Sequence, residues 1–187
     1  DELGALLTAA KLDVARLKSK IGTLSPDVVE RLGHLTETLN TGIALKRRIV
    51  EDLHPSSLYH LGLTASLEIL THEFSNHSGI PINTDLDTVE IDAAGQLTIY
   101  RLIQESLTNI GKYAEATLIT VTVQNYTGHV QVDVHDNGKG FDMAHVRPST
   151  HGIAGMRHRV EAAGGRLTVI SSPGNGTHIS AALPTHT

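Results

Sequence analysis

Hydrophobic residues near the start of the chain repeat with the spacing of a helix that packs against another helix. Their intervals alternate between four and three residues, and they are Leu3, Leu7, Ala10, Val14, Leu17, Ile21 and Leu24. Ser25 and Pro26 then provide an N-cap and a first-turn proline for a second helix that continues towards Pro55. Two helices joined by so short a turn form an antiparallel hairpin with one buried face. We therefore expect a homodimer that completes a four-helix bundle.

The hydrophobic pattern then changes, which predicts a domain boundary. The heptad spacing lapses, and apolar positions over residues 63–74 predict a short amphipathic helix. We accordingly divide the chain into a helical hairpin at 1–57, a linker with a short helix at 58–78, and a second domain at 79–187.

The second domain combines helix-period and strand-period patterns. Valine and isoleucine alternate with polar residues over 119–123 and again over 130–134, which predicts a β-hairpin with one buried face. The other predicted elements are a strand at 80–86, helices at 92–114 and 153–163, and a second hairpin at 167–183. Helices packed on a largely antiparallel sheet give an α+β sandwich.

Composition excludes several classes of protein. The chain has no cysteine, so it has no disulfide scaffold, thiolate zinc site or cysteine nucleophile. Residues 1–80 carry 8 basic and 10 acidic side chains and the remainder 7 and 10, so neither half favours nucleic acid. The sequence has neither a spanning apolar run nor a secretory pattern, so we expect this part of the protein to be cytoplasmic and without membrane contact. A membrane anchor in an N-terminal sensor region of the full-length protein stays open. Because it begins at Asp1 rather than methionine, we expect it to be part of a longer protein.

Two clusters of side chains have both a structural and a functional interpretation. His72, Glu73 and His77 resemble a zinc-protease motif, but a spacing of five places the histidines about 140° apart on a helix, so we reject zinc. The basic triplet at 46–48 is interpreted as a solvated helix surface, with a docking patch as the alternative.

Four signals in the second domain indicate a ligand site. Glu105, Asn109 and Lys112 recur at i, i+4 and i+7, which predicts a polar line on the 92–114 helix, although an ordinary wet face gives the same pattern. Asp136-x-Gly138-x-Gly140 follows a predicted strand, where glycines let the backbone approach a ligand, although common turns also have this pattern.

The other two signals are also glycine-rich. Gly152 and Gly155 open the predicted 153–163 helix, whose free N–H groups suit phosphate, and Gly176 precedes Thr177 in the last turn. Each signal is weak alone, but their order on the expected elements favours a nucleotide site.

This combination resembles the ATP-binding domain of sensor histidine kinases, in the gyrase, Hsp90, histidine kinase and MutL superfamily, over essentially the whole chain. Residues 104–109 look like the N-box, which implies that Glu105 and Asn109 are functional and that Asn109 holds Mg²⁺ against the phosphates. Lys112 and Tyr113 stand where the family has Lys-His, which implies phosphate contacts.

The glycine motifs resemble the family's remaining nucleotide boxes. Residues 136–140 look like the G1 box, which implies that Asp136 accepts a hydrogen bond from the adenine amino group and repels the guanine carbonyl. Residues 152–156 look like the G2 box, and 141–151 like a short mobile lid. The ATP-binding residues that the resemblance adds to the N-box region are Asp136, Gly138, Gly140, Gly152, Ile153, Gly155, Met156 and Thr177.

The start of the chain resembles the nitrate and lipid-fluidity sensor type of histidine kinase. Residues 1–4 match the family's His-Asp-Glu-Leu-Gly motif from its aspartate onward, so the phosphate-accepting histidine falls just before Asp1. The resemblance implies phosphoryl transfer from ATP to that histidine and then to an aspartate of a response regulator, with Asp1 as the base that fixes the histidine tautomer. We expect the chain itself to bind ATP without autophosphorylation.

The sequence departs from the family pattern at one functional position, and two alternative functions stay open. Family members with phosphatase activity usually carry glutamine where this chain has Ala5, whose side chain cannot form a hydrogen bond, so the sequence leaves phosphatase activity open. The alternatives to a sensor kinase core are a stand-alone ATPase of the same superfamily, with Glu105 as the base for water, and a non-catalytic dimeric signalling scaffold.

Overall fold

The computed structural model describes residues 2–20, 26–53, 55–142 and 151–185. The chain divides into two compact units, Asp1–Ser56 and Ser57–Thr187. Within the described ranges, no helix is both long enough and apolar enough to cross a membrane.

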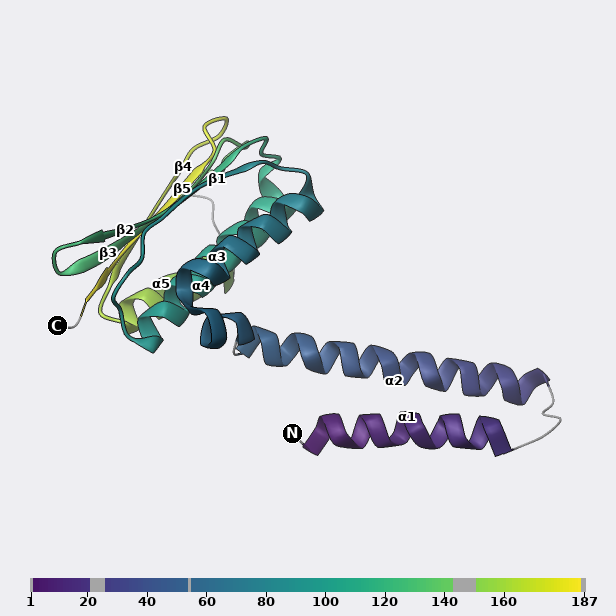
Figure 1. Ribbon diagram of the computed structural model, residues 1–187. Coiled ribbons are helices and arrows are strands. Elements are labelled where there is room, and N and C mark those ends of the chain that lie inside the picture. The colour runs from purple at the N-terminus through teal and green to yellow at the C-terminus, as the bar shows by residue number, and fades with distance from the viewer. Residues whose placement is uncertain (1, 21–25, 54, 143–150, 186–187) are drawn as a thin grey trace. The chain divides into compact units, whose positions relative to one another are not determined.

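The first unit is a pair of helices, α1 (Glu2–Lys20) and α2 (Pro26–Leu53) (Figure 1). The second helix begins at Pro26, where the sequence predicts its first turn. Val14 is buried, and Leu7 lies over Gly42, where an added Cβ would be 3.9 Å from a Leu7 methyl carbon.

One partner helix covers only part of the apolar surface of α1. Leu17, a member of the predicted heptad seam, is 51% exposed in the single chain. Other exposed apolar residues of the two helices are Leu6, Leu12, Val28, Val29 and Leu35. Ile21 and Leu24 of the predicted seam lie outside the described residues.

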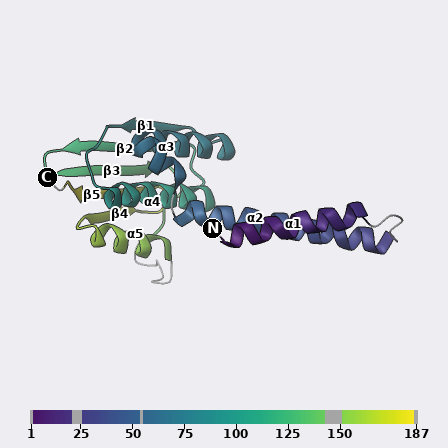
Figure 2. The same cartoon turned by 60° about the horizontal axis from the view of Figure 1, so that its bottom comes forward.

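The second unit is a five-stranded sheet with helices on one face (Figure 1). Its elements are α3 (Ser56–Ser78), β1 (Ile82–Leu86), α4 (Ala93–Asn109), the π-helical turn η1 (Ile110–Ala114), β2 (Ile119–Tyr126), β3 (His129–Asp136), α5 (His151–Ala162), β4 (Arg166–Ser171) and β5 (Thr177–Pro184). The strand order is β1-β2-β3-β5-β4, which Figure 2 shows, and only β1 and β2 are parallel. The predicted α+β sandwich is confirmed.

The core lies between the sheet and the helices. Val121, Val132 and Val134 alternate with more exposed polar residues along β2 and β3, so each strand buries one face. An apolar face of α4 packs in the same core, and its residues Ile99, Ile103 and Leu107 are at most 1% exposed.

Helix α3 is longer than the short helix that the apolar spacing predicts. It contains a break at Gly62, whose φ of 78° and ψ of 178° lie outside the helical region and are open to glycine. After this break Leu63 and Leu67 enter the core of the second unit, with Leu67 fully buried.

The core position of α3 gives a testable prediction. Leu67→Ala removes a fully buried side chain and leaves a cavity, so we expect the free energy of unfolding of the second unit to fall by about 2–5 kcal/mol. Leu61→Ala, on the same helix but 56% exposed, changes it by less than about 0.5 kcal/mol. Denaturant titration of the 187-residue chain measures both, and equal effects would contradict the packing described here.

Candidate nucleotide-binding site

The polar line of α4 ends in a linked glutamate and asparagine. Glu105 and Asn109 are both partly buried, and the Asn109 amide nitrogen donates a hydrogen bond to Oε1 of Glu105 at 3.4 Å. This bond orients the amide, and no hydrogen bond from a described residue reaches its carbonyl oxygen. One side-chain oxygen is therefore available to a ligand.

Helix α5 begins directly beside this pair. A Cβ added to Gly152 would lie 2.7 Å from Oε1 of Glu105 and 3.2 Å from Nδ2 of Asn109. On the next turn Met156 is buried, and its sulfur accepts a hydrogen bond from Ser106 at 3.7 Å. The α4 and α5 motifs, which are far apart in the sequence, therefore meet at one place.

Ile153 and Gly155, which follow Gly152 in α5, have different surroundings from it. Ile153 is partly buried and packs against the core. Gly155 lies under the guanidinium of Arg159, where an added Cβ would be 3.4 Å from Nη1. The first turn thus presents Gly152, rather than a bulky side chain, to the polar pair of α4.

Asp136 is a buried carboxylate at the end of β3. It is only 2% exposed, and its Oδ1 accepts a hydrogen bond of 2.8 Å from the backbone N–H of Gly138. No described residue donates to Oδ2. In the sheet register Asp136 lies opposite Thr177, the first residue of β5. The site therefore offers a fixed acceptor beside a threonine.

Three backbone segments meet around Asp136 without intervening side chains. A methyl group on Gly138 would overlap the carbonyl oxygen of Ala114, and one on Gly176 would overlap that of Asp136. A methyl group on Gly140 would likewise overlap the carbonyl oxygen of Ser172. We call Gly138, Gly140 and Gly176 the glycine corner. It joins the end of η1, the loop after β3 and the β4–β5 turn.

Two polar residues that are not among the predicted site residues hold this corner. Oδ1 of Asn137 accepts hydrogen bonds from the backbone N–H groups of Thr117 and Leu118 at 2.9 and 3.0 Å. Ser171 Oγ accepts from the N–H of Phe141 and donates to the carbonyl of Gly176, both at 2.9 Å. The Asn-Gly pair after a strand was a sequence signal for Asn137, whereas Ser171 had none.

Lys112 and Tyr113 lie on η1, beyond the end of α4. Both are exposed, Tyr113 by 64%, and no hydrogen bond or ion pair joins either to Glu105, Asn109 or Asp136 among the described residues. Because a π-helical turn rotates the chain less per residue than an α-helix, Lys112 does not continue the straight polar line that the i, i+4, i+7 spacing predicts. Asp1 and lid positions 143–150 lie outside the described residues.

An exposed ion pair lies at the rim of the glycine corner. Lys139 Nζ is 2.7 Å from Oε1 of Glu115. The hydrogen bond from Lys139, together with its positive charge, holds the pKa of the Glu115 carboxyl below its ordinary value. Both side chains are largely exposed, so the pair stabilises the fold only slightly.

A side-chain oxygen of the site could help to hold a magnesium ion that also binds phosphates. Within the part of the chain that the structure describes, no group of three histidine, cysteine, aspartate or glutamate side chains could hold a metal ion. Mg²⁺ usually takes one or two protein oxygens and completes its shell with water and substrate phosphate oxygens. The open carbonyl oxygen of Asn109 fits this role.

The sequence and the fold are similar to those of known histidine kinases. The family described as histidine kinase-, DNA gyrase B- and HSP90-like ATPase matches residues 94–187. The chain is 29% identical to the histidine-protein kinase/phosphatase DegS of Brevibacillus brevis, over 84% of this chain and 42% of that protein. It is 31% identical to the kinase/phosphatase UhpB of Salmonella typhimurium, over 98% of this chain and 37% of that protein.

A solved structure has the same fold. The histidine kinase domain of the Erythrobacter litoralis EL346 blue-light activated histidine kinase aligns with a TM-score of 0.63 over 95% of both chains, at 20% identity. The family match over residues 94–187 shows that the chain belongs to the histidine kinase-, DNA gyrase B- and HSP90-like ATPase family. It spans less than half the length of the curated relatives described above.

The glycine corner gives a second prediction. Gly140 has a φ of 58° and no room for a side chain, whereas Gly174 has a φ of 82° and open space around it. Both alanine variants incur left-handed backbone strain of about 1–2 kcal/mol. Gly140→Ala also forces the loop away from Ser172, so we expect it to destabilise the second unit by about 1–3 kcal/mol more. Thermal unfolding of the two variants checks this, and equal losses would contradict the close approach.

Proposed function

We propose that this chain is the catalytic core of a sensor histidine kinase that binds ATP between α4, α5 and the glycine corner. The observation that carries the proposal is the buried Asp136 carboxylate, which keeps one oxygen open beside the glycine corner. An adenine amino group is a donor that this acceptor recognises, whereas the guanine carbonyl at the same position is repelled.

The triphosphate lies along the Glu105, Asn109 and Gly152 cluster in this proposal. Gly152 leaves space beside the two side chains, and the free N–H groups of the first turn of α5 suit phosphate oxygens. Thr177 supports the adenine side, and Lys112 and Tyr113 reach the phosphates from the π-helical turn.

The polar pair on α4 has the leading role in phosphoryl transfer. Glu105 accepts the Asn109 N–H and so directs the amide oxygen of Asn109 towards Mg²⁺. When bound, Mg²⁺ neutralises the charge that develops on the phosphate oxygens. The acceptor is the histidine expected before Asp1, and Asp1 fixes its tautomer as the neighbouring base.

The first unit forms the dimer interface in this proposal. Leu17 of the heptad seam is exposed in the single chain, and a second copy of the hairpin covers this seam as a four-helix bundle. We propose residues 1–57 as this dimerisation and phosphotransfer domain and 79–187 as the ATP-binding domain. The phosphoryl group then passes to an aspartate in the receiver domain of a response regulator.

The adenine contact predicts a specific loss of affinity. In Asp136→Asn the amide keeps an acceptor for Gly138 but presents a donor to the adenine amino group. A hydrogen bond to a charged group contributes about 1.5–3 kcal/mol, so ATP affinity falls by about 10- to 150-fold. Displacement of a fluorescent ATP analogue measures the change, with thermal unfolding as the check on folding.

A neighbouring aspartate provides the matched control. Asp133 lies on the same strand, on the opposite face of the sheet, where its carboxylate contacts His178 at 2.8 Å. Asp133→Asn leaves ATP affinity unchanged, and GTP displaces the analogue from the wild type more weakly than ATP. Equal losses in both variants, or equal ATP and GTP affinities, would refute the proposed adenine contact.

The acceptor site is tested by labelling with γ-³²P-ATP. The 187-residue chain remains unlabelled, because the proposed acceptor is not one of its residues. A chain extended by a histidine before Asp1, together with the residues preceding it, acquires an acid-labile label. Label on the unextended chain would contradict this assignment. Steady phosphate release that Glu105→Ala abolishes, without labelling of either chain, would instead favour the stand-alone ATPase.

A further inference from the structure

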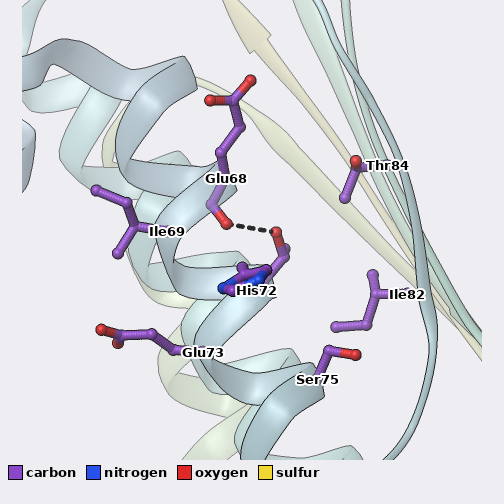
Figure 3. Close-up of a pocket in the computed structure, with 8 residues that line it drawn as sticks. Glu68, Ile69, His72, Glu73, Ser75, Ile82 and Thr84 are labelled. Carbon is purple, nitrogen blue, oxygen red and sulfur yellow. Dashed lines mark hydrogen bonds between the residues drawn. The ribbon is translucent and has the colours of Figure 1, made fainter.

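Helix α3 and edge strand β1 are tied together at two points, and a pocket opens between them. Ser75 Oγ donates a hydrogen bond to the carbonyl of Ile80 at 2.8 Å, just before β1 begins. Thr64 Oγ1 donates to the carbonyl of Asp87 at 3.4 Å, just after β1 ends. Between these ties lies a pocket of about 570 Å³, in which Figure 3 shows Ile82 and Thr84 opposite residues of α3.

The pocket adjoins an open sheet edge. Among the strands that the structure describes, β1 pairs only with β2, through contacts that include Ile119 N–H to Pro81 and Asp87 N–H to Val123. Because parallel strands direct alternate residues towards the partner, residues 83 and 85 face β2, and the backbone groups of Ile82 and Thr84 face away from it. These N–H and C=O groups can pair with another extended chain.

The elements around the pocket carry a strong negative charge. Residues 55–100, which contain both α3 and β1, hold six acidic residues and no lysine or arginine. Two of the six, Glu68 and Glu73, line the pocket and are exposed. The lining contains no lysine or arginine, and its remaining members are Ile69, Thr71, His72, Ser75, Ile82 and Thr84.

We propose that this edge is a docking site for an extended segment of a partner protein that carries lysine or arginine. The segment adds to the sheet as a strand beside β1, pairing with the backbone of Ile82 and Thr84. Its cationic side chains lie against Glu68 and Glu73, which give the site its preference for basic sequences. None of these residues belongs to the candidate nucleotide site, so the two proposals can fail separately.

The probe is the acetylated and amidated hexapeptide Thr-Lys-Val-Lys-Val-Thr, added at millimolar concentration to the 187-residue chain. Amide hydrogen exchange followed by NMR reports strand addition directly, because pairing protects edge-facing N–H groups. We expect exchange at Ile82 and Thr84 to slow at least tenfold, with no change at Asp136. The same peptide with both lysines replaced by glutamate gives no protection.

Three variants separate the charge from the backbone contribution. Glu68→Gln weakens peptide binding at least fivefold, whereas Glu161→Gln, the same change on the exposed surface of α5, leaves it unchanged. Thr84→Pro removes an N–H that faces the edge and not β2, so it abolishes binding while the β1–β2 pairing persists. The dispersed amide signals of each variant in the NMR spectrum stay close to those of the wild type and show that the second unit is folded.

Several outcomes would overturn the docking site. They are absence of protection by the lysine peptide, equal protection by the glutamate peptide, and equal weakening by Glu68→Gln and Glu161→Gln. Protection of Ile82 and Thr84 that rises with protein concentration alone, without peptide, would show that a second copy of the chain occupies the edge instead.

Discussion

The candidate site depends on a backbone approach too close for any side chain. At the glycine corner, the end of η1, the loop after β3 and the β4–β5 turn lie against one another through bare peptide groups. The N–H of Lys139 reaches Ala114, and the N–H of Gly174 reaches Lys139, each at 2.7 Å. This contact fixes Asp136 at the end of its strand and ties it to the segment that follows α4.

Packing in the core positions the other half of the site, which consists of the polar pair on α4 and the first turn of α5. Helix α4 lies on the sheet through Ile99, Ile103 and Leu107, which directs Glu105 and Asn109 away from the strands. Met156 inserts beside Ser106 and brings the first turn of α5 against those two polar side chains. The candidate motifs of α4 and α5 come together because the apolar faces of these two helices pack in one core.

Local patterns in the sequence predicted most of the secondary structure. The alternation around Val121 and Val132 identified two strands, and Pro26 marked the start of α2. These signals are local, since burial on one face and a fixed φ are properties of neighbouring residues. The strand order, in which β5 lies between β3 and β4, depends on contacts distant in the sequence and left no comparable local signal.

The site was predictable in composition but not in geometry. The glycines and the Glu105 and Asn109 pair were identified by spacing, whereas the π-helical turn that displaces Lys112 breaks the 3.6-residue period on which that spacing depends. The contact of Gly152 with Glu105 and the anchoring role of Ser171 arise from packing between separate elements. The pocket between α3 and β1 likewise lies between separate elements, which are joined by the hydrogen bond from Thr64 to Asp87.

The most direct test of the account is a crystal structure of the 187-residue chain with Mg²⁺ and a non-hydrolysable ATP analogue. We expect the adenine amino group within hydrogen-bond distance of Oδ2 of Asp136, and Mg²⁺ on the amide oxygen of Asn109. A nucleotide bound elsewhere on the chain, or bound here with its purine away from Asp136, would contradict it.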